Sequence, residues 1–111
     1  MNEIAFGVTN WETVEKTTHK GDQGSATWRT CYFGSESNRI RVRMVDYSAR
    51  YESDHWCEKG HILLCLKGEL VTKLADGREF ILKAGSSYQV ADDTEPHRSS
   101  TKLGATLFIV D

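Results

Sequence analysis

Residues 61–90 read HILLCLKGELVTKLADGREFILKAGSSYQV, a series of short apolar runs separated by turn residues. The runs cover residues 61–66, 69–74, 78–83 and 87–90, and Lys67-Gly68, Ala75-Asp76-Gly77 and Ala84-Gly85 stand between them. Glycine and Asp-Gly at such positions are typical of the turns that join antiparallel strands. Short strands that recur about every ten residues predict an all-β fold, an antiparallel sandwich or barrel.

The same pattern continues on both sides of this segment. Residues 26–33 are rich in β-forming side chains, and residues 106–110 form a last apolar run. Between them, residues 38–47 place Ile40, Val42 and Met44 alternately with Arg39, Arg41 and Arg43. An alternation with period two predicts a half-buried strand. The arginine face is either the solvent face or the inner face of a barrel, where arginine would bind a carboxylate and Tyr88 and Ser99 would line the same cavity.

Length and charge limit the classes of protein that this chain can belong to. Its 111 residues suit one domain, with an N-terminal arm over residues 1–25 and a barrel over residues 26–111, and we expect Trp11 to pack against the barrel. A net charge of −2 with mixed signs gives no reason to expect a nucleic-acid or membrane partner. No apolar run reaches the roughly 20 residues that span a bilayer, and the first residues lack a secretory signal. We therefore expect a cytoplasmic protein whose three cysteines are reduced.

The candidate site residues lie in two short segments, Asp54-His55-Trp56-Cys57-Glu58-Lys59-Gly60-His61 and Glu95-Pro96-His97, which contain three of the four histidines. If residues 54–57 form a strand, His55 and Cys57 share one face. A hairpin loop over residues 58–60 would then place Cys57 opposite His61 and His55 opposite Leu63. His97 would reach the same centre from another strand.

These residues predict a metal site with the ligands His55, Cys57, His61 and His97. Nitrogen and sulfur donors suit a divalent transition metal such as Zn, Fe, Ni or Cu better than Mg or Ca. Other readings stay open: the histidines as ordinary pocket residues, Cys57 as a small buried hydrophobe, or Cys57 and His61 as a thiol–imidazole nucleophile without metal. We expect Cys65 to pack in the core and His19 to lie on the surface.

The acidic residues beside these segments have two readings as well. Asp92, Asp93 and Glu95 are most simply a solvated turn, and Asp54 lies next to His55. One of these four carboxylates could instead orient a ligand imidazole from behind.

The two segments resemble the motifs of the cupin superfamily. The first cupin motif has two histidines one residue apart, a later glutamate and a closing glycine, which correspond to His55, Cys57, His61 and Gly68. Gly85, Tyr88-Gln89-Val90 and Pro96-His97-Arg98 resemble the second motif, with His97 at its ligand position. The closest likeness is to small cupins described by an Asp-His-Cys-Trp motif, although this chain reads Asp-His-Trp-Cys.

The resemblance implies a cupin-type jelly-roll barrel, a homodimer, and a metal-dependent enzyme of the oxygenase or isomerase type that acts on a small molecule. The alternative is a non-catalytic cupin that binds or senses a small molecule. Many cupin enzymes use histidines and one carboxylate, whereas this chain has His61 at the carboxylate position and Cys57 at a histidine position. No particular reaction and no catalytic residue are carried over for that reason.

Overall fold

The computed structural model describes residues 3–111, and β-strands make up nearly all of its regular structure. The strands are β1 (Lys16–Lys20), β2 (Ser25–Phe33), β3 (Ile40–Tyr47), β4 (His61–Leu74), β5 (Glu79–Lys83), β6 (Ser87–Val90), β7 (His97–Ser100) and β8 (Ala105–Val110). Two short 3₁₀ turns, η1 (Trp11–Thr13) and η2 (Glu36–Asn38), are the helical elements of the described residues. The prediction of an all-β fold is confirmed.

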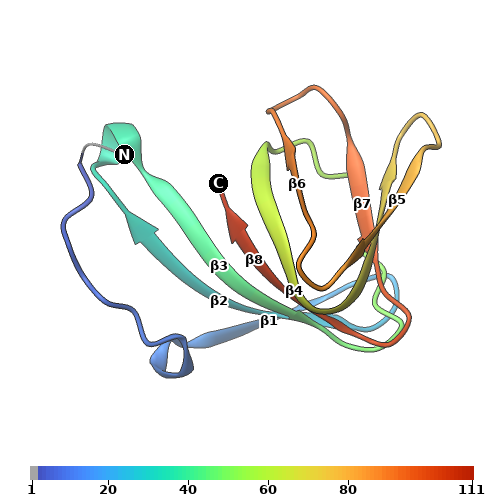
Figure 1. Cartoon of the computed structure of the whole chain (residues 1–111), viewed down its shortest axis with the longest axis horizontal. Helices are drawn as coiled ribbons and strands as arrows, with labels where there is room; N and C mark the ends of the chain where they lie inside the picture. The colour runs from blue at the N-terminus through green and yellow to red at the C-terminus, as the bar shows by residue number, and fades with distance from the viewer. Residues whose placement is uncertain (1–2) are drawn as a thin grey trace.

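All strand pairs are antiparallel, and the order across the sheet is β1-β2-β3-β8-β4-β5. The short strands β6 and β7 also pair with β4, at its beginning and its end respectively. Figure 1 shows the result, in which β1, β2, β3 and β8 curl along one side and β5, β6 and β7 stand on the other. The long strand β4 belongs to both sides and therefore connects the two walls of an open barrel.

The length of β4 differs from the prediction of two separate strands over residues 61–66 and 69–74. Its pairing with β8 shifts between Cys65 and Lys67, which marks a β-bulge. Gly68 follows with a φ of +76° and packs against the Gly104 carbonyl, where a Cβ atom would collide. A glycine at this position lets the strand bend without ending, so one strand serves both walls.

One strand was not predicted from the sequence. β1 lies inside the expected arm over residues 1–25, where it forms the outermost strand of the sheet and pairs with β2. β7 begins at His97, which was expected to come from another strand, but the bounds of that strand were not predicted. The arm is therefore only partly separate from the sheet, and Trp11 packs edge-to-face on Phe108 with 6.2 Å between ring centroids, as expected.

The core fills the space between β3, β4 and β8. Its fully buried side chains are Val45, Leu63, Cys65, Leu70 and Leu107. Cys65 thus packs in the core as predicted. His19 was expected on the surface, but it is half-buried and stacks on Trp28 with 3.9 Å between ring centroids.

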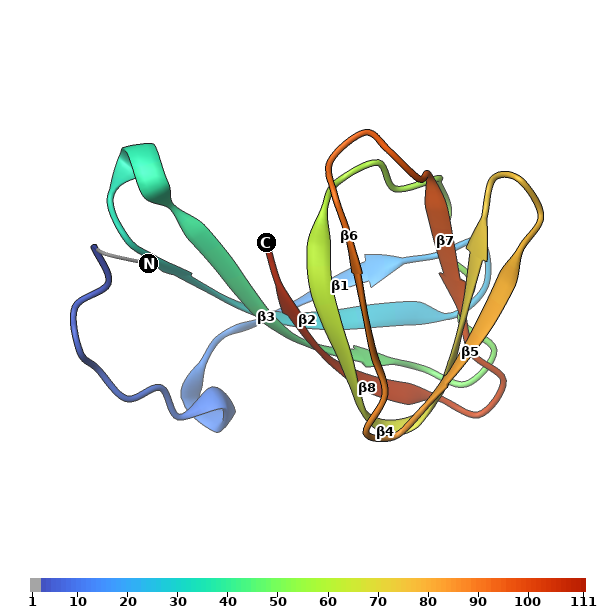
Figure 2. The same ribbon diagram turned by 45° about the horizontal axis from the view of Figure 1, so that its top comes forward.

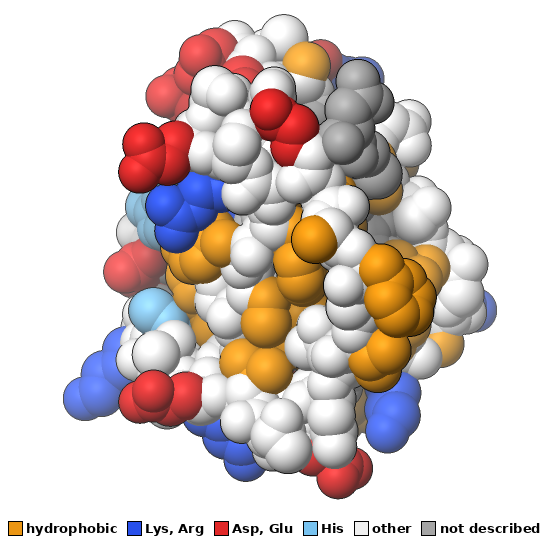
Figure 3. All heavy atoms as spheres, turned by 90° about the vertical axis from the view of Figure 1, so that its left-hand side faces the viewer, with side chains coloured by type: hydrophobic (Ala, Val, Ile, Leu, Met, Phe, Trp, Pro, Cys, Tyr) orange, Lys and Arg blue, Asp and Glu red, His pale blue; other side chains and the backbone are white. Residues whose placement is uncertain are grey.

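The N-terminal arm leaves an apolar groove against β2 and β3. Ile4, Val8, Phe33, Ile40 and Val110 are among its lining residues. Figure 2 shows the arm at the opposite end of the molecule from β5 and β7, and Figure 3 shows hydrophobic side chains gathered on the face at the arm's end of the molecule. The expectation of a homodimer stays a prediction. No helix among residues 3–111 is long and apolar enough to cross a membrane.

Candidate metal centre

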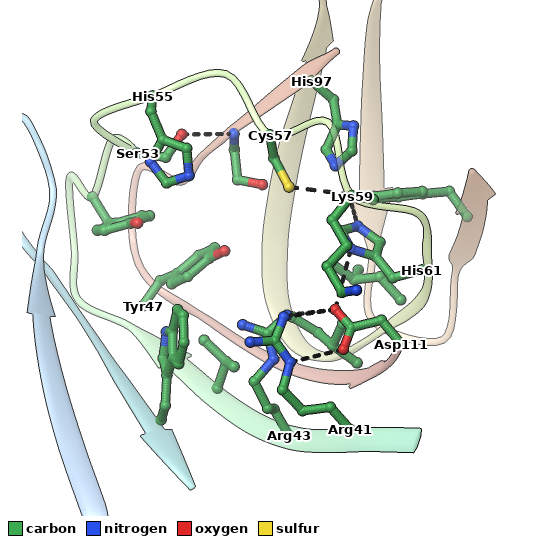
Figure 4. A pocket seen from close by; sticks show the side chains of 17 residues that line it. Arg41, Arg43, Tyr47, Ser53, His55, Cys57, Lys59, His61, His97 and Asp111 are labelled. Atoms are coloured by element: carbon green, nitrogen blue, oxygen red, sulfur yellow. Dashed lines mark hydrogen bonds and ion pairs between the residues drawn. The ribbon is translucent and has the colours of Figure 1, made fainter. Parts of the chain in front are cut away.

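Three of the predicted ligands come together in the barrel. Cys57, His61 and His97 each offer a ligand atom, and these three atoms all lie within 4.8 Å of one another. Cys57 lies in the loop before β4, His61 begins β4, and His97 begins β7. Figure 4 shows the three side chains converging at one end of a ring of residues that line a cavity.

The backbone around Cys57 and His97 explains their proximity. The Cys57 N–H donates to the His97 carbonyl at 2.8 Å, and the His97 N–H donates to the Cys57 carbonyl at 3.0 Å. This isolated β-bridge holds the loop against the start of β7. Pro96 precedes the bridge, where its missing N–H is not needed.

His61 is positioned by a second anchor. The Gly60 N–H donates to Asp92 Oδ1 at 2.6 Å, and His61 then pairs with Val90 on β6. A Cβ atom on residue 60 would meet the backbone of Ala91 and Asp92, so this close approach requires glycine. Asp92 is therefore more than a solvated turn residue: its carboxylate fixes the start of β4.

The predicted hairpin over residues 54–61 is wrong. Residues 53–60 form an irregular loop, Cys57 is bridged to His97, and the partner of His61 is Val90. The loop is held by two segments distant in sequence, β7 and the turn after β6, so it does not fold back on itself. Cys57 and His61 still lie close together, as the hairpin was expected to place them, but they do so through pairing with segments that are distant in the sequence.

The structure does not bring His55 into this group. Its side chain is 72% exposed, and its Nδ1 lies 2.6 Å from Asp54 Oδ1. His55 does line the cavity, as the labelled ring in Figure 4 shows. The predicted set of four ligands thus becomes a compact set of three with His55 nearby.

Both imidazoles in the group keep a nitrogen without a protein partner. His97 Nδ1 lies 2.8 Å from the Glu95 carbonyl oxygen, which fixes the proton on Nδ1, and its buried Nε2 has no partner. His61 Nε2 lies 2.8 Å from the Tyr88 hydroxyl, and its buried Nδ1 has no hydrogen bond and lies 4.0 Å from Asp111 Oδ2. Buried polar atoms are nearly always hydrogen-bonded, so unpartnered nitrogens beside a thiol point to an absent ligand.

The pKa shifts of the three groups are coupled. Burial, followed by the neighbouring His97, lowers the pKa of His61 to about 4, so this imidazole is neutral near pH 7. The His97 imidazole lowers the pKa of the Cys57 thiol, and the thiol in turn raises the pKa of His97. A transition metal binds neutral imidazole and thiolate. The shifts of His61 and Cys57 favour these forms, whereas the raised pKa of His97 favours its protonated form, from which a metal must displace the proton.

The three groups line one end of a cavity of about 320 Å³. Arg41, Arg43, Tyr88 and Ser99 also line it, which confirms the inner-face reading for Arg41 and Arg43 and the placement of Tyr88 and Ser99. Asp111 was missed: it holds Arg41 with two hydrogen bonds of 2.8 Å and Arg43 with one of 3.2 Å. A signal existed, because period two puts Asp111 on the same strand face as the buried Leu107 and Ile109.

Comparison with known proteins identifies the fold. No protein-family model matches the sequence, and no curated protein matches it. An RmlC-like cupin from Shewanella frigidimarina NCIMB 400 is 16% identical with a TM-score of 0.72, over 97% of this chain and 91% of that one. A sugar phosphate isomerase of the cupin superfamily from Silicibacter pomeroyi DSS-3 is 16% identical with a TM-score of 0.69, over 94% and 74%.

A third solved structure, Fe(II) HppE in complex with its substrate, is 17% identical with a TM-score of 0.74, over 96% of this chain and 60% of that one. The three similarities agree on one architecture. The chain has the RmlC-like cupin fold, as the sequence motifs predicted.

Proposed function

We propose that this cupin-fold protein binds one divalent transition metal through Cys57, His61 and His97 and is a metal-dependent enzyme acting on a small molecule in the barrel cavity. The observation that carries the proposal is the convergence of a thiol and two buried imidazoles with unpartnered nitrogens at one end of that cavity. Three protein ligands leave a coordination position open, as catalytic sites do, whereas a fourth ligand would close the site.

The donor set narrows the choice of metal. Two nitrogens and a sulfur fit Zn, Fe, Ni or Cu, and hard cations that prefer oxygen fit poorly. The Fe(II) form of HppE, which shares the fold, supports iron as the first metal to test. When bound, such a metal would polarise an oxygen atom of the substrate as a Lewis acid.

Two residues of the chain would act beside the metal ligands. Burial raises the pKa of the Tyr88 phenol, so Tyr88 stays protonated and can donate a hydrogen bond into the site. Asp111 Oδ2 lies 4.0 Å from His61 Nδ1, the nitrogen that has no hydrogen bond, so this carboxylate would face a metal held there and add negative charge beside it. A hydrogen-bond donor beside a polarised oxygen suits isomerase or oxygenase chemistry, and the sugar phosphate isomerase with this fold supports the first.

Two rival functions have specific support. The lowered pKa of Cys57 beside His97 is the pattern of a thiol–imidazole nucleophile, although the partner is His97 rather than the His61 expected from the sequence. A protein that only binds or senses a small molecule would use the same cavity without catalysis. Both rivals predict that the fold and the cavity persist without metal.

Metal analysis of untagged protein tests the proposal. The wild-type protein should retain about one equivalent of transition metal, and His97→Ala should lower the metal affinity at least tenfold, because removing even a residue that only orients a ligand typically costs about 10- to 100-fold. His55→Ala is the matched control and should retain the metal, since His55 lies outside the group. Circular dichroism of each variant checks that the fold persists.

The sulfur ligand has its own readout. Cobalt-substituted protein should show a thiolate charge-transfer band that Cys57→Ser abolishes. Full metal occupancy in His97→Ala, or a wild-type protein that takes up no metal, would contradict the site. The thiol–imidazole and binding functions would then take its place.

A further inference from the structure

The charged side chains that line the cavity are unequal in sign. Arg41, Arg43 and Lys59 line it together with one carboxylate, Asp111. Lys59 makes no ion pair among the described residues. In Figure 4 the two arginines rise from β3 toward Asp111, and Lys59 lies on the same side of the cavity. The polypeptide therefore leaves positive charge there without a counter-charge.

Arg43 is the more weakly paired of the two arginines. Arg41 occupies both oxygens of Asp111, so Arg43 obtains a single contact of 3.2 Å with Oδ2. The Arg43 residue is only 6% exposed, and its Nε is buried with no hydrogen-bond partner. Burying a charged donor without a partner is costly, which indicates that an acceptor from outside the chain completes this site.

The residues around Arg43 indicate the shape and polarity of the rest of that acceptor molecule. The guanidinium carbon lies 4.4 Å from the Trp28 ring centroid, and Tyr47 and Tyr51 stack with 4.2 Å between their centroids. All three rings line the cavity. The faces of the Trp28 ring are covered by His19 and Arg43, so the flat apolar surface left for a ligand is that of Tyr47 and Tyr51. Arg43 and His61 both approach Asp111 Oδ2, so a small molecule can reach from the guanidinium to the group of Cys57, His61 and His97.

We infer that the cavity binds a small carboxylic acid with a planar, apolar body, whose carboxylate pairs with Arg43 and Lys59 while its other end faces the candidate metal centre. Arginine offers a planar fork that matches a carboxylate, and Lys59 adds a second point charge. The inference names a substrate class and rests on the proposed function only for the statement that this acid is transformed. Binding of the acid itself depends on β3 and Lys59 and needs no metal.

Chemical-shift titration of isotope-labelled protein, stripped of metal, tests the inference with benzoate and its neutral analogue benzamide as probes. Benzoate should bind about tenfold or more tightly than benzamide, because a hydrogen bond to a charged group exceeds a neutral one by about that factor. The shifted signals should include those of Trp28 and of β3. Equal affinity of the two probes for the wild-type protein would overturn the inference.

Substitutions locate the binding group. Arg43→Gln should lower the affinity ratio of benzoate to benzamide several-fold, since only Lys59 then offers the carboxylate a charged hydrogen bond. Lys59→Gln, at an exposed residue whose loss cannot unfold the protein, should weaken benzoate several-fold. Arg39→Gln is the matched control for positive charge nearby: Arg39 stacks on Tyr32 and lines a neighbouring hollow with Lys59, but it does not line the cavity, so this variant should bind benzoate as the wild type does.

The outcomes separate this inference from the proposed function. If Arg43→Gln does not fold, Lys59→Gln and Arg39→Gln decide the question between them. Phenylphosphonate binding more tightly than benzoate would overturn the assignment to a carboxylate. Benzoate binding that survives while no metal is taken up supports the acid site and rejects the metal site, and the reverse result rejects the acid site alone.

Discussion

Asp111→Asn tests how much of the cavity wall depends on one buried carboxylate. The Asp111 side chain is 1% exposed and accepts three hydrogen bonds, two from Arg41 and one from Arg43. Asparagine keeps the shape of the side chain but removes the charge, which leaves Arg43, whose side chain is 8% exposed, without a counter-charge. Breaking a buried ion pair by neutralising one partner costs about 3–5 kcal/mol.

The lower end of that range applies here. The Arg41 side chain is 25% exposed and can recover hydrogen bonds from water, whereas Arg43 cannot. We therefore expect Asp111→Asn to lower the free energy of unfolding by about 3 kcal/mol. The matched control is Asp76→Asn, which breaks a pair with Arg78 whose side chains are about half exposed. A surface pair contributes about 0–1 kcal/mol, so the control should change little.

Urea denaturation at neutral pH measures the free energy of unfolding of both variants. The same measurement at decreasing pH tests the direction in which the stabilisation by Asp111 changes. Burial raises the pKa of Asp111, but the hydrogen bonds of Arg41 and the charges of Arg43 and Arg41 outweigh it and hold that pKa below its usual value. The folded pKa is thus lower than the unfolded one of about 4, so the stabilisation is present above about pH 4 and is lost as the pH falls further. Asp111→Asn has no ionisable group at this position, so its free energy of unfolding should not show this decrease at low pH. A loss for Asp111→Asn no larger than that for Asp76→Asn would refute the reasoning.

Two further outcomes follow from burial. Leu107→Ala removes a core side chain that is 0% exposed and should lower the free energy of unfolding by about 2–5 kcal/mol, whereas Leu103→Ala, 91% exposed, should stay within about 0.5 kcal/mol in the same urea assay. In metal-free protein the His61 ring should stay neutral down to about pH 4, because burial lowers its pKa; ring-proton NMR that shows a midpoint near the ordinary value of about 6.5 would contradict that burial.

Much of the fold was predictable because its main strands carry their own pattern. β2, β3, β5, β6 and β8 all lie within or next to runs of alternating or apolar residues. Two strands lack such runs: β1, which reads KTTHK and was not predicted, and β7, which reads HRSS and was expected only as the strand that carries His97. Their pairing is made by backbone hydrogen bonds to a neighbour that is distant or weakly marked in the sequence, and periodicity does not report it.

The site was predictable in its residue types but not in its geometry. The sequence singled out Cys57, His61 and His97, and it placed Cys57 against His61 through a local hairpin. The structure instead pairs Cys57 with His97, at the far end of the barrel sequence. A hairpin over residues 58–60 is an alternative to that long-range bridge. In the structure the Gly60 N–H donates to Asp92 Oδ1, and this contact favours the bridge over a tight turn.

The same geometry determines when the metal site comes into existence. Cys57, His61 and His97 belong to a loop and two strands that meet only after β4 has paired with β6 and β7. The core that holds those strands, including Leu63 and Leu107, consists of apolar side chains and needs no ligand. Under the proposed function, metal binding therefore follows folding, in contrast to small domains that fold only around their metal. Removing the metal should leave the barrel intact, since each imidazole ring is already held through its other nitrogen, His97 by the Glu95 carbonyl and His61 by the Tyr88 hydroxyl, and the His97 backbone is bridged to Cys57.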